Sequence, residues 1–355
     1  MKYLLTGYFL SIAFAVTFAQ DIRILVKPVD SKFWGYSDAN GKVYDAKYLY
    51  CEPFSEDGVA VVYSSARKQY RIINRFGREI ETEVTDFDVK DYLSYYPGQF
   101  TGGYLVMRMA NRWGAMDTTG KVIVPMKWKT LLEFEKGYGI GVLKDRFSVI
   151  NARTGRETLL DEEIVEMKPF QEGMAPAKFK NGKEGFIDTT GRIAIKPEFQ
   201  QVGYFFGGIA WAKNIEGMIG YINKSAEWVI NPFYTAVKNM DPVSGLARVM
   251  FNEKWYYISL KGEMIDFGMS EIMDDFHDGL SKGRKDGKWG FLNSKGEWVI
   301  KPRFVNARDF KNGYAAVSIQ TNNTEDELWG IIDTTGNWLI EPKFRMAKDV
   351  VVLKP

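Results

Sequence analysis

The apolar and polar residues of this chain alternate in short runs that are too brief for helices. In Lys288–Val317, aromatic and β-branched residues occur in brief runs, and turn-forming residues separate them. Such runs are typical of β-strands, and no segment of any length has the periodicity of an amphipathic helix. The pattern predicts one strand around Trp289, a second at Trp298–Ile300 and a third at Tyr314–Val317.

Turn residues join these predicted strands. Asn293-Ser-Lys-Gly296 combines a side chain that can bond its own backbone with a glycine that can adopt positive φ, which is typical of a β-hairpin. Pro302 is expected to end the second strand, because proline cannot donate a hydrogen bond to a ladder. A loop, with at most a short helical turn, then leads to Phe-x-x-Gly and the third strand. The hairpin slot also holds Asp-Thr-Thr-Gly at Asp117, Asp188 and Asp333.

The same unit recurs nine times and fills residues 20–355. Units begin near residues 34, 70, 113, 147, 184, 219, 255, 289 and 329, so the period is about 36 residues. Arg71, Ser148 and Tyr256 replace the motif glycine in the weaker copies. A unit this short cannot bury enough apolar surface alone, so neighbouring units are expected to share one core.

These observations predict an all-β array of about nine repeats, each with three short antiparallel strands. Nine units exceed the usual four to eight blades of a propeller, and propeller blades generally have four strands. An open solenoid or superhelix is therefore favoured, and a closed, propeller-like ring is the alternative.

The motif resembles that of the WG-repeat proteins, also called KWG-repeat proteins, which are widespread in bacteria. The shared pattern is Lys-x-Trp-Gly, a hairpin with Asp and Gly, Pro-x-Phe or Tyr, and then Phe-x-x-Gly-x-Ala-x-Val. Lys288–Val317 and Leu328–Phe344 match it closely. The resemblance implies an all-β repeat array. It implies no particular activity, because the group lacks an established biochemical function, and no catalytic residue carries over.

Residues 1–19 have the pattern of a signal peptide. Lys2 precedes an apolar run from Leu4 to Val16, and small residues lead to a cleavage position near Ala19. The run is short for a membrane span, so cleavage is favoured over an uncleaved anchor. The protein is expected to be exported, to the periplasm, the cell surface or the medium, without stable insertion into a membrane.

Composition narrows the partners and the chemistry. The chain has 47 basic and 45 acidic residues, which gives no electrostatic footprint for a nucleic acid. Cys51 is the single cysteine, so no internal disulfide can form, and no histidine partner for its thiol is predicted. His277 is the single histidine and fills a variable turn position, so an exposed turn histidine is favoured over a general base.

The acidic motifs also favour structure over catalysis. Asp-Thr-Thr-Gly differs in spacing from the Asp-Thr-Gly of aspartic proteases, and turn formation explains its three copies better. Asp161–Glu163, and Asp274-Asp275 with Asp278, lack the spacing of a calcium loop and are expected to be solvated. We therefore predict a non-enzymatic protein with no catalytic residues, no cofactor and no metal site.

Aromatic residues are the candidates for contact with a partner. Trp228, Trp298 and Trp338 recur just after the hairpin turn. Core packing is favoured for these tryptophans, although each could show an edge to a ligand. Tyr92, Tyr95 and Tyr96 lie in an insertion and are a second candidate. The function favoured is a binding or scaffold module for proteins, peptides or surface glycans. The alternative is a cell-envelope hydrolase that uses carboxylates of adjacent repeats. The sequence leaves the ligand and the oligomeric state open.

Overall fold

The computed structural model describes residues 20–64, 66–89, 98–265, 267, 272–320 and 327–355. All regular elements in this part of the chain are β-strands. No helix within these ranges is long and apolar enough to cross a membrane. The predicted signal peptide lies outside the described residues, as do Tyr92, Tyr95 and Tyr96.

The strands form small antiparallel sheets. One sheet has the order β29 (Asn306–Ala307), β30 (Tyr314–Gln320), β31 (Glu327–Asp333), β32 (Trp338–Val352), β1 (Ile22–Pro28), β2 (Trp34–Ser37), β3 (Val43–Tyr48). A second sheet pairs β4 (Val59–Ser64) with β5 (Gln69–Asn74), and a third contains β6 (Tyr104–Met109), β7 (Arg112–Asp117) and β8 (Val122–Trp128).

The remaining sheets of the described chain have four strands each. The first contains β9 (Thr130–Leu131), β10 (Tyr138–Leu143), β11 (Arg146–Asn151) and β12 (Arg156–Leu159), and the second β13 (Ile164–Met167), β14 (Met174–Phe179), β15 (Glu184–Asp188) and β16 (Ile193–Phe199). The third contains β17 (Gln201–Val202), β18 (Ile209–Lys213), β19 (Ile219–Asn223) and β20 (Trp228–Tyr234). The fourth contains β21 (Ala236–Val237), β22 (Leu246–Phe251), β23 (Lys254–Ser259) and β24 (Met264–Ile265), and the last β25 (Ile272–His277), β26 (Leu280–Lys285), β27 (Lys288–Leu292) and β28 (Trp298–Phe304).

The all-β repeat array is confirmed, and two details differ from the sequence prediction. Complete units have four strands, because two residues of the expected loop, as in β29, pair with the following hairpin. The second strand also continues through Pro302 to Phe304. Proline is tolerated there because β28 is the outermost strand of its sheet, so the missing N–H breaks no ladder bond.

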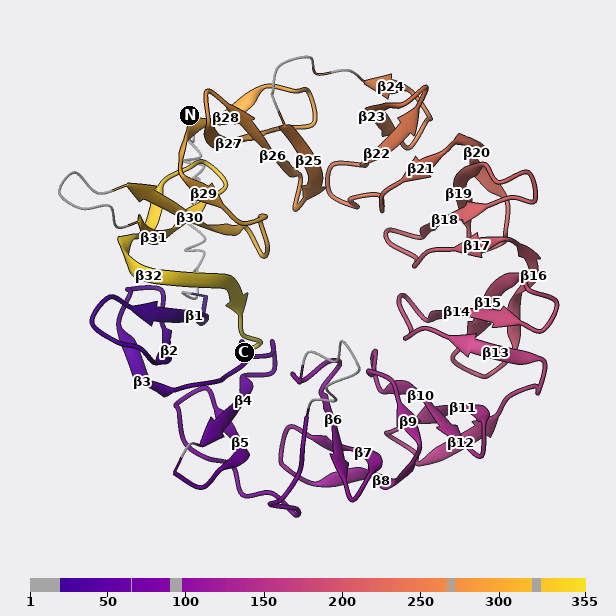
Figure 1. Ribbon diagram of the computed structural model, residues 1–355, viewed down its shortest axis with the longest axis horizontal. Helices are drawn as coiled ribbons and strands as arrows, with labels where there is room; N and C mark the ends of the chain where they lie inside the picture. Colours follow the sequence, from indigo (N-terminus) through magenta and orange to yellow (C-terminus); the bar gives the residue numbers. More distant parts are fainter. Residues whose placement is uncertain (1–19, 65, 90–97, 266, 268–271, 321–326) are drawn as a thin grey trace, which may run out of the picture.

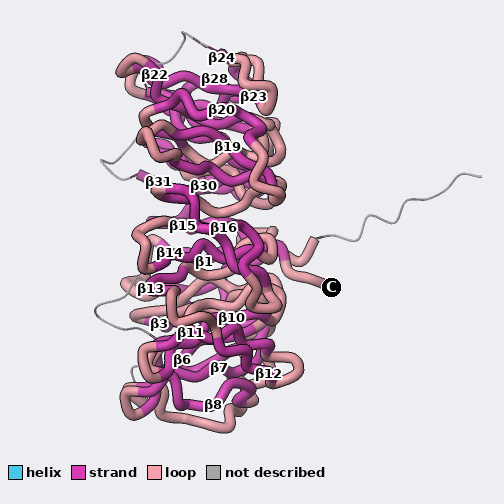
Figure 2. The backbone as a smooth tube through the Cα atoms, turned by 90° about the vertical axis from the view of Figure 1, so that its right-hand side faces the viewer, coloured by secondary structure: helices cyan, strands magenta, loops and turns pink. Residues whose placement is uncertain are grey.

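The units follow one another around a common centre, and the first strand, β1, lies beside the last, β32 (Figure 1). β32 pairs with β31 through its first half and with β1 through its second half, where Ile24 lies opposite Val350 and Ile22 opposite Val352. Seen edge-on, the sheets form a thick disc (Figure 2). The sequence favoured an open array, but the pairing of β1 with β32 fits the propeller-like alternative. The complete units also have four strands each, which is the usual number in a propeller blade.

Hydrophobic clusters join the successive units. Phe291 and Ile300 of one sheet pack with Phe310 and Val317 of the next. Where the ends of the chain meet, Ile24 and residues of β31 and β32 form an equivalent cluster. Each unit therefore completes its core with residues of its neighbour, as expected for a repeat protein.

The motif glycine is required for space rather than for an unusual backbone conformation. A Cβ on Gly290 would lie 2.5 Å from the Ile300 carbonyl oxygen, and one on Gly220 would lie 2.3 Å from the Ile230 carbonyl oxygen. Neither glycine has positive φ. The register shifts at this point, so β28 bulges against β27 and leaves no room for a side chain.

The Asp-Thr-Thr-Gly hairpins form as predicted and also connect units. The Asp188 carboxylate accepts hydrogen bonds from the backbone N–H groups of Thr190 (2.8 Å) and Arg192 (3.0 Å). Gly191, with φ of 88°, packs against Thr158 of the preceding sheet. The turn is therefore a structural element, in agreement with the sequence analysis.

Candidate binding site

The Phe-x-x-Gly segments form hairpins that point toward the centre of the array (Figure 1). Their tips are two-residue turns in which both residues have positive φ, such as Asp278 (50°) and Gly279 (82°). This conformation is that of a type I′ turn, which glycine favours. The phenylalanine is buried between units, and it fixes the residues beside it on the inner wall.

Acidic side chains at several tips bind the backbone of the next tip. Both carboxylate oxygens of Glu172 accept backbone N–H groups, from Gly207 at 2.7 Å and Gly208 at 2.9 Å. Asp241 accepts the N–H of Gly279 at 3.2 Å, and Asp278 accepts that of Gly313 at 3.0 Å. These carboxylates hold neighbouring tips together, and two of them, Glu172 and Asp278, are themselves turn residues with positive φ.

Ion pairs join neighbouring units on one arc of the inner wall. Arg248 bonds Asp275 of the following sheet through its Nε atom. Lys282 Nζ lies 2.9 Å from Asp309 Oδ1. In each pair, a cation of one unit meets a carboxylate of the next.

A third pair continues this arc to the end of the chain. Arg308 Nε donates to Asp349 Oδ1 at 2.5 Å. The acids of all three pairs directly precede a buried residue of the hairpin, namely Phe276, Phe310 or Val350. This shared slot was a signal in the sequence that the analysis of motifs missed.

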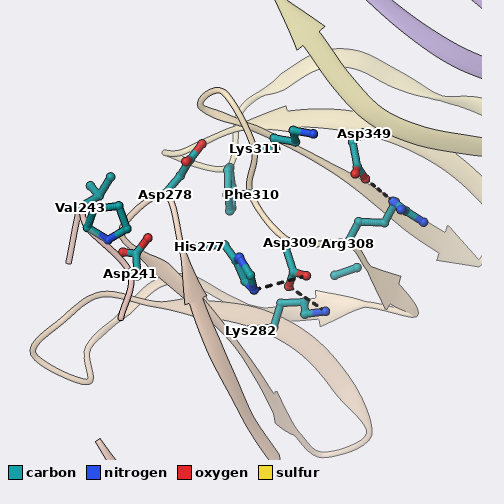
Figure 3. A pocket seen from close by; sticks show the side chains of 12 residues that line it. Asp241, Val243, His277, Asp278, Lys282, Arg308, Asp309, Phe310, Lys311 and Asp349 are labelled. Carbon is teal, nitrogen blue, oxygen red and sulfur yellow. Dashed lines mark hydrogen bonds and ion pairs between the residues drawn. The ribbon is translucent and has the colours of Figure 1, made fainter. Parts of the chain in front are cut away.

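A cavity of about 590 Å³ opens along this arc (Figure 3). Cations on its lining are Lys282, Arg308 and Lys311, and anions include Asp309 and Asp349. The volume is within the range of small-molecule and peptide side-chain sites. The cavity therefore offers a ligand charges of both signs, supplied by several units.

The charges around Lys282 favour its protonated form. Burial alone would lower the pKa of Lys282, but Asp309 and Asp274 outweigh it, and the pKa is above its ordinary value. Burial would raise the pKa of Asp274, but the N–H of Asp275 and the cations Lys282 and Arg248 lower it overall. The carboxylates of the wall itself therefore hold Lys282 in its protonated form.

His277 lies on the lining of the cavity. It is the last residue of β25 and is 49% exposed, as expected of a turn residue. Its Nε2 atom lies 3.7 Å from Asp309 Oδ2, so the two attract each other when the imidazole is protonated. The sequence alone did not indicate that this turn faces a cavity.

The recurrent tryptophans pack within the array, two of them against the preceding sheet, and none of them lines this cavity. The Trp228 ring meets Phe199 edge-on at 5.8 Å between centroids, and Trp338 meets Phe304 in the same way at 5.9 Å. Trp298 covers Gly283, where a Cβ would lie 2.7 Å from its ring. All three are half-buried, so their main contacts are with the array itself.

The other candidate residues have structural surroundings. Burial raises the pKa of the Cys51 thiol to about 12, against a smaller lowering by its bond to Tyr36, so the thiol is protonated at neutral pH. Glu163 pairs with Lys180 at 3.1 Å. Within the described ranges, no three His, Cys, Asp or Glu side chains are grouped as metal ligands.

Five segments of the chain match the family described as "WG containing repeat": residues 113–145, 185–216, 219–255, 289–320 and 329–350. Together these segments span less than half of the chain, and each of them is similar to a WG-containing repeat. The matched segments at 289–320 and 329–350 supply Arg308, Asp309 and Asp349 of the cavity. The weak copies at Arg71 and Ser148 lie outside the matched segments. No curated protein matches the chain in sequence.

Solved structures with similar folds are distant in sequence. One, described as the eukaryotic initiation factor, has a TM-score of 0.58 at 10% identity, over 95% of this chain and 100% of that chain. PorZ, a bacterial surface component of the type-IX secretion system of Porphyromonas gingivalis, has a TM-score of 0.33 at 12% identity, over 92% and 46%. The WD40 beta propeller domain of Doa1 has 0.30 at 10% identity, over 64% and 82%. The first shows a shared fold alone, and the other two TM-scores are too low to define one.

Proposed function

We propose that this protein is an exported, non-enzymatic binding module that holds a protein or peptide segment in the inner-wall cavity. The cavity of about 590 Å³, lined by cations and anions of neighbouring units, is the observation that carries the proposal. A polypeptide carries charges of both signs at short intervals, so it can satisfy such a lining. Export is supported by the signal-peptide pattern of residues 1–19. Cleavage after Ala19 would leave β1 intact.

The partners of the carboxylates favour binding over catalysis. Asp309 is paired with Lys282, and Asp349 with Arg308. Asp241 and Asp278 hold backbone N–H groups of neighbouring tips. These partners belong to the array itself, so a structural contact accounts for the position of each of these carboxylates.

The lining favours a peptide over a glycan. Phe310, whose ring lies on the lining, is 2% exposed, so it offers little surface on which a sugar could stack. Trp228, Trp298 and Trp338 pack within the array, and none of them lies on this lining. Val243, which is 68% exposed, gives the rim an apolar surface that suits an aliphatic side chain.

A blocking substitution tests this proposal. Val243→Trp should fill the mouth of the cavity without disturbing the core, because the side chain is exposed. Ile215→Trp is the matched control, since Ile215 is 62% exposed and does not line the cavity. Both variants and the wild type are applied to an array of short peptides of varied charge. The peptides that bind are then titrated by calorimetry.

The expected result is peptide binding that Val243→Trp abolishes and Ile215→Trp preserves. Binding that both variants retain would place the site elsewhere. Turnover of peptidoglycan or polysaccharide that one carboxylate substitution abolishes would refute the non-enzymatic proposal and support the hydrolase alternative. N-terminal sequencing of the exported protein tests the leader, with Gln20 as the expected first residue.

A further inference from the structure

A second cavity adjoins the first on the inner wall. It has a volume of about 400 Å³, and it shares Arg308 and Asp349 with the larger cavity. Its other lining residues include Lys348 of β32 and, from the β1 side of the junction, Trp34 and Leu49. The two cavities therefore form a continuous site with Arg308 between them.

The guanidinium of Arg308 has hydrogen-bond donors that no described residue uses. Its Nε atom is bonded to Asp349, and Figure 3 shows this contact from the larger cavity. The structure shows no hydrogen bond from Nη1 or Nη2 of Arg308 to any described residue. The bond to Asp349 fixes the guanidinium, so its two terminal nitrogens form a rigid fork of the kind that binds a carboxylate in a bidentate manner.

Lys348 adds a second cation beside this fork. Its Nζ atom lies 5.8 Å from the centre of the Trp34 ring, and no ion pair joins it to a described carboxylate. Lys27 Nζ lies 6.0 Å from the same ring but does not line the cavity. The cavity side of Trp34 thus has a cation that is free to meet an anion.

The second cavity also has apolar groups on its lining, beside the polar Gln99 and the carboxylate of Glu52. Leu49 is 56% exposed and Trp34 is half-buried, and both lie on the lining with Pro53. An exposed leucine that faces a concave surface gains by burial against an apolar ligand group. The cavity therefore combines an anchor for an anion with a pocket for an apolar side chain.

We infer that this second cavity binds a carboxylate and an adjacent apolar side chain of the same peptide. The Arg308 fork and Lys348 hold the carboxylate, and Trp34 and Leu49 pack against the apolar group. This inference rests on the proposed peptide-binding function and extends it to a defined chemistry. The carboxylate could belong to the C-terminus of a peptide or to an acidic side chain.

Short acetylated peptides distinguish these sources in calorimetric titrations. One probe ends in phenylalanine with a free carboxylate, and a second is its C-terminal amide. A third is amidated and has an internal Phe-Asp pair, and a fourth has Phe-Asn instead. Binding of the first probe alone assigns the site to a C-terminus, and binding of the third alone assigns it to an acidic side chain. Equal binding of all four peptides, or of none, would overturn the inference.

Variants test the residues with the probe that binds. Arg308→Gln and Lys348→Gln should each weaken binding by about tenfold or more, because each removes a charge-assisted hydrogen bond. Lys27→Gln should leave the affinity unchanged. Asp349→Asn is the structural control, since it removes the charge of the ion pair but keeps an Oδ1 atom that can accept from Arg308 Nε and fix the fork, and it should retain binding.

Equal loss of affinity in Arg308→Gln and Asp349→Asn would show that Arg308 supports the structure of the array and does not itself bind the peptide. Trp34→Leu should weaken binding of phenylalanine probes more than that of alanine counterparts. If other peptides still bind in the larger cavity while these variants have no effect, the inference fails and the proposed function stands. If no peptide of the array binds the wild type, the proposed function itself fails.

Discussion

Replacing Gly290 with alanine is expected to separate β28 from β27. The added Cβ would lie 2.5 Å from the Ile300 carbonyl oxygen, 2.7 Å from the Pro302 nitrogen and 2.9 Å from the Lys301 carbonyl carbon. All three are backbone atoms, so no side-chain rotation can relieve the contacts. The φ of Gly290 lies outside the left-handed region, so an effect of the substitution would be steric.

Overpacking of this kind costs about 1–3 kcal/mol. If the substitution lowers the free energy of local opening of β28 by this amount, amide exchange in Trp298–Phe304 should accelerate roughly five- to 150-fold. Hydrogen exchange read by mass spectrometry resolves this segment from the neighbouring strands. A repeat array need not unfold in one step, so a local measurement is more informative than a single melting temperature.

Gly287→Ala is the matched control. A Cβ there has no atom within 4 Å, but Gly287 has φ of 71°, so its cost is that of a left-handed alanine, about 1–2 kcal/mol. Its exchange should increase at the turn between β26 and β27 and leave β28 protected. If Gly290→Ala leaves the protection of β28 unchanged, the steric explanation of the motif glycine is wrong.

Other contacts of the array can be tested in the same protein. The raised pKa of Cys51 predicts no alkylation by iodoacetamide at pH 8 in the folded state and full alkylation in urea, and rapid modification of folded protein, seen by mass spectrometry, would contradict this. Glu172→Ala should lower the free energy of unfolding by about 1–3 kcal/mol, because two backbone N–H groups of the next tip lose their acceptor, whereas exposed Glu162→Ala should have little effect in denaturant titrations. Burial raises the pKa of Asp333, but hydrogen bonds from the hydroxyl and N–H groups of its turn lower it overall, so its contribution is present above the unfolded-state pKa of about 4 and is lost as pH falls through the folded-state value. Asp333→Asn should therefore flatten the acid limb of the pH–stability curve, and identical curves would refute this account.

The strands and turns could be predicted because their signals are local. The run around Trp289 became β27, and the Asx side chain of Asn293 bonds the backbone of its own turn, as its position indicated. Two-residue strands such as β29 have no periodicity to detect, so the fourth strand of each unit was missed. Pro302 was expected to end its strand because the sequence did not show that β28 is an edge strand.

The meeting of the chain ends could not be predicted from local patterns. It depends on β32, whose first half completes one unit and whose second half completes the first unit of the chain. The segment after Phe344 looks like a terminal extension in the sequence. Only the pairing of Ile24 with Val350 shows that it replaces a strand that the first unit would otherwise lack.

The candidate site follows from the slots that vary between repeats. The residue before the buried hairpin side chain is Pro169, Tyr204 and Asn239 in three consecutive units. In the next three it is acidic, and each of these acids pairs with a cation of the preceding unit. Turn glycines and phenylalanines build every unit alike, so they cannot distinguish one part of the wall from another. Because the paired charges occupy a single arc, we expect one ligand per chain rather than one per repeat, and a calorimetric stoichiometry near nine would contradict this assignment. The three acids are Asp275, Asp309 and Asp349.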